Sequence, residues 1–410
     1  MMRSRWIVVA VALCLCTTAL GAQHRRLTYV PDTAFQLADQ GIRRLVTALV
    51  RKDGRIVVAS EYYYGEAIAL DSMGRKLPWA LPLGPQRGEV GTVGSWGWVG
   101  DSLWIADGFF KQIAIVGGDA KVAASIRFPS WVRPFWRDRR KYPLFSDMAW
   151  LAMYGDGTML VEPSQSRTLL DTPGYDRSQK LLVRVDRDGR IVRTVARVPE
   201  MDGRMVLRSG AERRTVTVPG YARTFWKAST DGERVAVLTP SPKDSGAFQV
   251  TMLSSWGDTV FSKRYVVDAA RAAKSAMDGF LASIKPFGRY TAEQIRDTVA
   301  KQISAFSSPV LALHVGLDHS TWVRVRRPAS DPRQSEWFVI DEKGAPVGNA
   351  FFALTFRPTA LSVDRIWTVE RDRVQQTSTI VRLRRADATG VRPARSARTS
   401  ASSTPARPRE

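Results

Sequence analysis

Cysteine, histidine and asparagine are almost absent from this chain of 410 residues. Its only cysteines are Cys14 and Cys16, close to the N-terminus, and its three histidines are His24, His314 and His319. If the N-terminal segment is removed, no disulfide, thiolate metal site or cysteine nucleophile can form. Three histidines also leave little material for a Ser-His-Asp triad or a histidine-based zinc site. We therefore expect no cofactor.

Signatures of common enzyme classes are missing as well. The sequence contains no phosphate-binding GxxxxGK[ST] loop, no GxSxG nucleophile elbow and no GxGxxG dinucleotide motif. These absences argue against a nucleotide-dependent enzyme and an α/β-hydrolase. They favour a protein that binds a partner over one that catalyses a reaction.

The N-terminus carries the pattern of an export signal. Arg3 and Arg5 precede an apolar run, Trp6–Leu20, that is too short to span a bilayer comfortably. Small residues follow at Gly21 and Ala22, where a signal peptidase could cut. We predict a signal peptide over 1–22 and a periplasmic or extracellular protein with no transmembrane span after cleavage. The alternative is an uncleaved N-terminal anchor.

The chain is strongly basic, with a formal net charge of +22. A basic surface attracts polyanions, and for an exported protein these are envelope components before nucleic acid, which we do not expect as a partner. The partner remains open between an unknown protein, a peptide and an anionic envelope ligand, and a solvated surface without a specific partner is the alternative. The stretch 391–410 is predicted to be a disordered basic tail.

One short pattern recurs six times along the chain. An apolar segment leads into a tight turn that contains Asp, and a second apolar segment follows. The turn residues are Asp53, Asp101, Asp156, Asp231, Asp318 and Asp364. Short apolar segments bounded by Asp/Gly turns are typical of β-hairpins, and most repeats continue into a third strand and a second turn. We predict an all-β fold, a six-bladed β-propeller over 23–390, and a monomer.

The sixth repeat lacks a convincing fourth strand. We expect Leu27–Val30 to pair with it as the outer strand of blade six and so to close the ring, because an open strand edge is a liability. Two other folds fit the sequence less well. A two-domain β-sandwich does not account for six matched turns, and a seventh blade would need a seventh turn, which is absent.

The second repeat resembles those of six-bladed propellers of the NHL and TolB-like types. The resemblance lies in Gly100–Asp107, with the sequence GDSLWIAD, followed by Gln112–Val116. The Asn-Arg pair common in NHL repeats is absent after Asp107, where Gly108–Lys111 stands. The resemblance implies the fold and no specific subfamily or activity.

Long insertions occur in only one set of loops. The turns between first and second strands and between third and fourth strands are short, whereas the other loops carry the extra residues. They include a helical segment at about 267–306, whose second helix has a capping pattern at Thr291–Gln294. All these loops fall on one face of a propeller. We expect that face, at the mouth of the central channel, to carry the function.

Acidic, aromatic and basic residues gather in the loops of that face. Carboxylates beside aromatic rings suit sugars, peptides or cations, and arginine grips anions through its planar fork. Packing between blades is the alternative for the aromatic residues. The candidate ligand-binding residues are Glu61, Tyr63, Glu66, Asp107, Phe109, Arg133, Trp136 and Arg139.

Two functions remain in contention. The first is an exported binding or scaffold propeller without catalysis. The second is a hydrolase or lactonase at the channel mouth, by comparison with calcium-dependent lactonases of the gluconolactonase type, whose metal site uses Glu, Asn and Asp. This chain has a single asparagine, Asn349, although Asp147, Glu89 and Glu162 could offer oxygens to a hard cation. We favour binding and assign no catalytic or metal-ligating residue.

Overall fold

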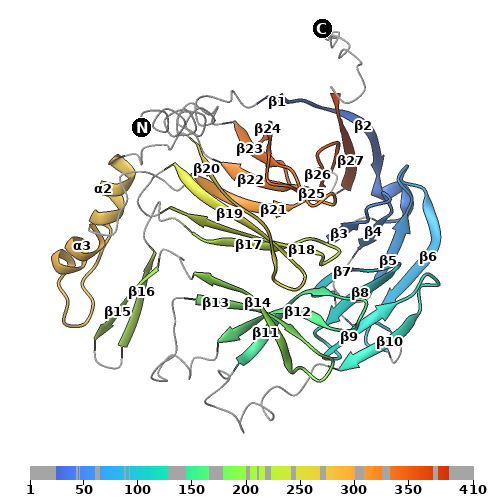
Figure 1. Ribbon diagram of the computed structural model, residues 1–410, viewed down its shortest axis with the longest axis horizontal. Coiled ribbons are helices and arrows are strands. Elements are labelled where there is room, and N and C mark those ends of the chain that lie inside the picture. Colours follow the sequence, from blue (N-terminus) through green and yellow to red (C-terminus); the bar gives the residue numbers. More distant parts are fainter. Residues whose placement is uncertain are drawn as a thin grey trace, which may run out of the picture.

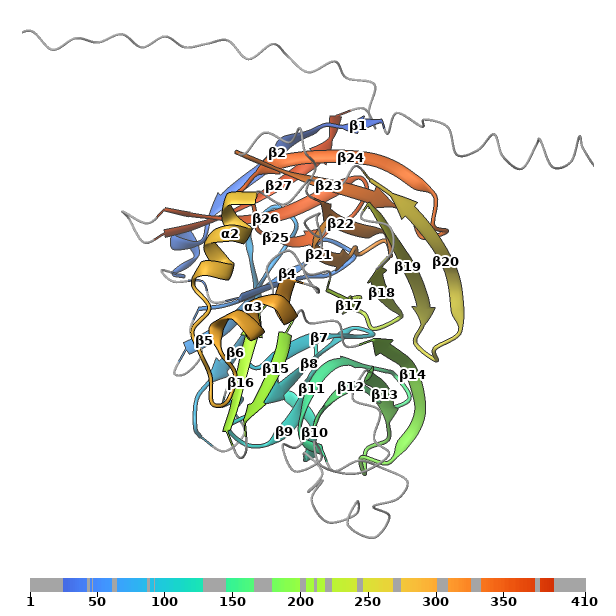
Figure 2. The same cartoon turned by 90° about the vertical axis from the view of Figure 1, so that its left-hand side faces the viewer.

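The computed structural model describes residues 25–42, 45, 47–60, 65–86, 89–91, 93–127, 145–165, 179–199, 204–209, 212–217, 223–241, 246–267, 274–300, 309–325, 333–372 and 377–386. Within these residues the chain is a six-bladed β-propeller, as predicted, and Figures 1 and 2 show the blades following one another around a ring. The predicted signal segment 1–22 and tail 391–410 lie outside the described residues.

Each blade is a four-stranded antiparallel meander, and blade five gains an additional strand, β1. Blade one is β3 (Thr47–Val50), β4 (Ile56–Ala59), β5 (Gly65–Leu70) and β6 (Lys76–Leu83). Blade two is β7 (Ser95–Val99), β8 (Ser102–Asp107), β9 (Gln112–Val116) and β10 (Val122–Arg127). Blade three is β11 (Phe145–Met153), β12 (Met159–Gln165), β13 (Gln179–Val185) and β14 (Ile191–Pro199).

The second half of the ring repeats this plan. Blade four is β17 (Phe225–Ala228), β18 (Arg234–Pro240), β19 (Ala247–Ser254) and β20 (Thr259–Val266). Blade five is β21 (Val310–Val315), β22 (Thr321–Val325), β23 (Gln334–Ile340) and β24 (Pro346–Ala353). Blade six is β25 (Pro358–Leu361), β26 (Arg365–Asp372), β27 (Thr377–Arg385) and β2 (Tyr29–Gln36).

The N-terminal strand closes the ring, but its bounds differ from the prediction. The outer strand of blade six is Tyr29–Gln36, paired antiparallel with β27, whereas β1 (Arg26–Leu27) pairs in parallel with β24 of blade five. The prediction of Leu27–Val30 was therefore right about the blade and wrong about the extent. Pro31 lies at a register shift of the pairing with β27, which an outer strand tolerates.

The Asp turns join first to second strands, and those of blades one, three, four and five share one hydrogen-bond pattern. In blades one, three and four a glycine follows the Asp with positive φ, as at Gly54, Gly157 and Gly232. The Asp carboxylate accepts a hydrogen bond from the backbone N–H two residues on, for example from Arg55 to Asp53 at 3.0 Å. These turns and the third-to-fourth turns lie on one face of the ring, which we call the turn face. The loops of the other face make up the insertion face.

Neighbouring blades pack through apolar side chains and through the third-to-fourth turns. The buried clusters join residues of adjacent blades, such as Val57 and Leu103 of blades one and two. In two pairs of neighbouring blades, the outer strand of one blade also donates a hydrogen bond to the third-to-fourth turn of the next. The Trp79 Nε1 donates to the Gly117 carbonyl at 3.0 Å, and the Tyr265 hydroxyl donates to the Gly344 carbonyl at 2.9 Å. The first bond connects blades one and two, and the second connects blades four and five in the same way.

Two insertions between blades lie in the described residues, and the helical one was predicted. A hairpin of β15 (Arg204–Ser209) and β16 (Glu212–Thr217) follows blade three, and α2 (Lys274–Ala282) and α3 (Ala292–Ala300) follow blade four. The predicted capping box is confirmed, because Thr291 and Gln294 exchange backbone-to-side-chain hydrogen bonds at 2.9 and 3.2 Å.

The hairpin and the helices support each other. The Arg214 Nη1 donates to the Lys285 carbonyl at 3.0 Å, and the Arg289 N–H donates to the Ser209 hydroxyl at 3.0 Å. They project to the left of the blades in Figure 1 and lie in front of them in Figure 2, which looks from that side. The two insertions thus form one layer on the ring. None of the helices in the described ranges is both long enough and apolar enough to cross a membrane.

Candidate functional site

A cavity of about 1330 Å³ lies on the insertion face where blades five, six and one meet. Its lining comes from strand ends opposite the Asp turns: the end of β24, the start of β25, the end of β26 and the start of β3. The first strands β25 and β3 are in contact, as first strands of adjacent blades are around a propeller axis. The cavity therefore opens beside the centre of the ring, on the face predicted to carry function.

The link between blades five and six forms one wall of this cavity. The rings of Phe352 and Phe356 stack, with centroids 4.0 Å apart and planes 11° from parallel. The Arg357 Nη1 donates to the carbonyls of Leu354 and Phe356, both at 3.0 Å, and the Thr368 hydroxyl donates to the Arg357 carbonyl at 2.9 Å. These contacts hold the link in one conformation, so the wall is formed before any ligand arrives.

Charged groups from two sides complete the lining. Arg357 and Arg371 bring two guanidinium groups, and Glu370 brings one carboxylate. The Arg371 Nη2 donates a hydrogen bond to the Leu45 carbonyl at 3.3 Å, and this bond connects blade six to the link before blade one. A pocket that joins guanidinium groups, an aromatic stack and threonine hydroxyls suits a ligand with carboxylate groups next to an apolar or planar part.

The predicted ligand-binding residues are only partly described. Glu61, Tyr63, Arg133, Trp136 and Arg139 lie outside the described residues. Of the remaining candidates, Glu66 is exposed, and its carboxylate lies 3.6 Å from the Lys76 ammonium. None of the three described candidates, Glu66, Asp107 and Phe109, lines the cavity between blades five, six and one, and the role of all eight in binding stays a prediction.

Asp107 and Phe109 lie together at the loop after β8. Asp107 is fully buried, and its carboxylate accepts hydrogen bonds from the N–H groups of Gly91, Phe109 and Phe110 at 2.8, 2.9 and 3.3 Å. These bonds fix the loop. The ring of Phe109 is half exposed and meets Phe110 edge to face at 5.0 Å. The structure thus shows Asp107 as an anchor that presents Phe109 to solvent.

The carboxylates named for a hard cation do not converge among the described side chains. Glu162 lies 3.4 Å from the Lys180 ammonium, and Glu89 accepts from the Gln86 N–H at 2.9 Å. The side chain of Asp147 lies outside the described part of the structure. The one group in the described ranges that gathers three ionisable ligand atoms is elsewhere, at Asp231, Glu233 and His319.

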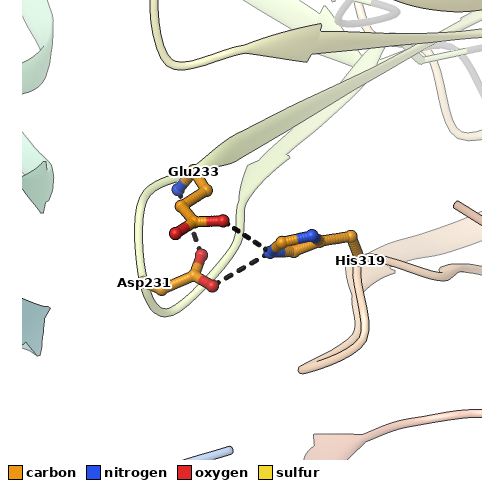
Figure 3. A group of neighbouring side chains, drawn as sticks. All are labelled: Asp231, Glu233 and His319. Carbon is orange, nitrogen blue, oxygen red and sulfur yellow. Dashed lines mark hydrogen bonds and ion pairs between the residues drawn. The ribbon is translucent and has the colours of Figure 1, made fainter. Parts of the chain in front are cut away.

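This group, the 231/233/319 cluster, bridges the Asp turns of blades four and five on the turn face (Figure 3). The His319 Nε2 lies 2.9 Å from the Asp231 Oδ2 and 3.6 Å from the Glu233 Oε2. The other oxygen of Asp231 accepts from the Ser229 hydroxyl at 2.5 Å and from the Glu233 N–H at 3.0 Å. His319 is buried, Asp231 is partly buried, and Glu233 is exposed.

Each of the two turns is held by blades other than its partner. The Thr230 carbonyl accepts from the Trp98 N–H of blade two at 3.1 Å, and Gly232 packs on Ala152 of blade three. In blade five, the Leu317 N–H donates to the Leu361 carbonyl of blade six at 2.7 Å, and the Asp318 carboxylate accepts from Val363 at 2.7 Å. The ring therefore fixes the backbones of the two turns that carry the three side chains.

The electrostatics of the cluster favour an ionised Asp231. Burial opposes ionisation, but hydrogen bonds from His319, Ser229 and the Glu233 N–H lower the pKa of Asp231 to about 2. The sequence pattern identifies Asp231 and Asp318 as turn residues, and the pairing of His319 with Asp231 was missed. One signal was available: a glycine follows the turn Asp in blades one, three and four, whereas His319 follows Asp318.

No protein-family model and no curated protein sequence matches this chain. Solved structures with a similar fold include a member of the DUF4221 family from Bacteroides vulgatus, with a TM-score of 0.49 and 8% identity over 89% of this chain and 99% of that one. A putative exported protein from Bacteroides fragilis has a TM-score of 0.41 and 10% identity over 87% and 94%. TolB from Acinetobacter baumannii has a TM-score of 0.35 and 9% identity over 81% and 65%. At these scores and identities the three structures assign no function to the chain.

Proposed function

We propose that this chain is an exported binding propeller that recognises a carboxylate-bearing partner through the cavity at blades five, six and one. The observation that carries the proposal is the cavity itself. This open cavity of about 1330 Å³ on the insertion face is lined by Arg357 and Arg371 together with the stacked rings of Phe352 and Phe356. A net charge of +22 adds long-range attraction for the same class of partner.

Binding accounts for this site better than catalysis does. The described cavity lining contains no histidine, and its single carboxylate, Glu370, is exposed beside two arginines. A general acid or base with a shifted pKa would need burial or a second carboxylate close by. Fixed walls and guanidinium forks instead provide recognition, since arginine binds carboxylates through paired hydrogen bonds.

Two defined polymers test the proposal. Polyglutamate and polygalacturonate both present carboxylates, the first on a peptide and the second on a saccharide. We expect the protein to bind at least one of them, and Arg357→Glu to weaken that binding about tenfold or more, because a charge reversal replaces attraction by repulsion. Isothermal titration calorimetry at fixed ionic strength measures the Kd of the unmodified protein and of Arg357→Glu.

A matched control separates the cavity from general charge. Arg365 is exposed in β26, at the turn-face end of the strand that carries Arg371 into the cavity. Arg365→Glu changes the net charge by the same amount and should leave the affinity within about twofold, because its charge is screened over that distance. Equal losses of affinity in Arg357→Glu and Arg365→Glu would show that net charge alone determines binding. That result would contradict the proposal for this cavity.

Export rests on the N-terminal pattern of Arg3, Arg5 and the apolar run Trp6–Leu20. In a Gram-negative host we expect the protein in the periplasmic or extracellular fraction, with a new N-terminus after Ala22. N-terminal sequencing of the fractionated protein measures this. Recovery of an intact Met1 in the soluble cytoplasmic fraction would contradict export.

A further inference from the structure

We propose that Asp231, Glu233 and His319 form a binding site for a divalent transition metal, of the Zn²⁺ type, that joins blades four and five on the turn face. The three side chains offer one imidazole nitrogen and two carboxylate oxygens, and these atoms all lie within 4.8 Å of one another. This site lies on the face opposite the cavity. The metal-site proposal does not depend on the function that we propose for the cavity.

The spacing of the ligand atoms fits a tetrahedral ion. With bonds of about 2.1 Å, two ligands of a tetrahedral Zn²⁺ are about 3.4 Å apart. The distances from the His319 Nε2 to the Asp231 Oδ2 and the Glu233 Oε2 are 2.9 and 3.6 Å. They bracket that value, and the two carboxylate oxygens lie within 4.8 Å of each other. The exposed side chain of Glu233 can adjust its position to complete the coordination. The fourth position is left for water, as in open zinc sites with three protein ligands.

The surroundings of the ligands orient them as a metal site requires. One oxygen of Asp231 is already held by the Ser229 hydroxyl and the Glu233 N–H, which leaves the Oδ2 directed at His319. Such outer hydrogen bonds align ligating carboxylates and contribute to metal affinity. Because neighbouring blades fix both turns, little chain entropy is lost when the ion binds.

The backbone at His319 is a second, separate observation. Its φ is 61°, in the left-handed region, where the equivalent turns of blades one, three and four have glycine. A side chain in that region is strained relative to glycine. The strained residue, His319, is the one whose side chain lies beside the carboxylates of Asp231 and Glu233 in blade four. Strain at a fixed position is a feature of functional sites.

The ligand set also selects among metals. An imidazole with two carboxylates suits Zn²⁺ and neighbouring first-row ions, whereas Ca²⁺ and Mg²⁺ prefer oxygen ligands alone. Zn²⁺ and its spectroscopic substitute Co²⁺ are therefore the probes, with Ca²⁺ as the comparison ion. The protein should carry no polyhistidine tag and should be treated with EDTA and dialysed beforehand.

His319→Gly is the decisive variant, because it restores the glycine of the other turns and so removes the ligand while relieving strain. We expect saturable binding of Zn²⁺ to the unmodified protein by calorimetry, a higher Tm with Zn²⁺ and not with Ca²⁺, and visible absorption bands with Co²⁺. In His319→Gly these responses should vanish while the Tm without metal is maintained. Glu233→Gln should weaken binding about tenfold or more.

The control is Asp53→Asn in the equivalent turn of blade one, which has no histidine beside it. It should bind Zn²⁺ as the unmodified chain does. Zinc binding that persists unchanged in a folded His319→Gly protein would overturn the proposal, as would a folded unmodified protein without saturable Zn²⁺ binding. If His319→Gly does not fold, Glu233→Gln decides, because Glu233 is exposed and its side chain can be changed without disturbing the core.

Discussion

Histidine shows most clearly how one residue type acquires different roles in this fold. His314 and His319 are five positions apart, yet His314 lies in strand β21 against Trp337, with ring centroids 5.4 Å apart, and His319 lies in a turn against two carboxylates. Burial, with a smaller contribution from the positive charge of Lys227, lowers the pKa of His314 to about 4. His319 instead has Asp231 within hydrogen-bonding distance.

His314 makes stability depend on pH in a defined window. Its folded pKa of about 4 lies below the unfolded value near 6.5. Between these values the unfolded chain binds more protons, so acidification from pH 6.5 to 4 should cost about 2–3 kcal/mol of folding free energy. His314→Phe keeps an aromatic ring and removes the titration. Urea unfolding at a series of pH values should show a shallower loss in this variant, and an unchanged slope would refute the assignment.

Glycine at the third-to-fourth turns meets two requirements at once. Gly257 has φ of 85°, and a Cβ added there would lie 2.7 Å from the backbone oxygen of Val195 in the preceding blade. Gly100, in the first-to-second turn of blade two, also has positive φ, at 58°, but a Cβ there would meet nothing within 4 Å. The two positions separate the conformational cost of a side chain from the cost of pushing blades apart.

The alanine variants at Gly100 and Gly257 should therefore differ in their free energy of unfolding. Gly100→Ala should destabilise the protein by about 1 kcal/mol through its φ alone. Gly257→Ala should cost about 1–3 kcal/mol more, because the contact is with backbone that cannot rotate away. Chemical denaturation with tryptophan fluorescence measures both values. Equal losses would mean that the blade contact at Gly257 contributes nothing.

At the scale of elements, the sequence predicts what depends on neighbours along the chain. The Asp turns, the capping box at Thr291–Gln294 and the order of blades are local, and they are confirmed. The extent of β2 was missed, because Pro31, Asp32 and Thr33 interrupt any apolar alternation. An outer strand needs little of that pattern, since one of its edges and much of its surface face solvent.

The candidate sites were beyond sequence reasoning for a related reason. Asp231 and His319 are 88 positions apart, and only the ring brings their turns together. The cavity combines the start of blade one with the ends of blades five and six, and Thr47 and Thr359 share no local pattern. Loop lengths did predict the face on which that cavity lies, because all the connections between blades return to the same side.

Buried arginines connect third strands to the next blade in two places. The Arg184 Nη1 donates to the Ser255 carbonyl at 3.3 Å, and the Arg382 Nη1 donates to the Ser72 carbonyl at 2.8 Å. Arg382 also pairs with Asp32 of β2 at 2.8 Å. One side chain thereby ties blade six, its N-terminal strand and blade one together at the point where the ring closes.

Removing this arginine should weaken ring closure. Arg382→Leu is expected to destabilise the protein by about 2–4 kcal/mol, because it removes the donor to the Ser72 carbonyl and the closer of the two arginines that pair with Asp32. The exposed Arg365 serves as the control, and Arg365→Leu should change stability by less than about 0.5 kcal/mol. Thermal unfolding of both variants gives the comparison. A Tm for Arg382→Leu equal to that of the control would contradict the role in closure.

At the scale of the whole molecule, the ring separates two sites on opposite faces. The turn face has short, rigid turns and carries the 231/233/319 cluster, whereas the insertion face carries the helices, the β15–β16 hairpin and the cavity beside blade six. Rigid turns suit a small ion whose ligands must be placed within tenths of an ångström. A larger opening among loops suits a partner that contributes several groups.

Hydrogen–deuterium exchange with and without the carboxylate polymer that binds tests the central claim most directly. Binding in the cavity should slow exchange in the segments 352–359 and 368–371, which line it, and leave the turn-face segments 51–55 and 362–365 unchanged. Protection confined to the turn face, or binding without protection of either cavity segment, would contradict the account of this protein as a propeller that binds through its insertion face.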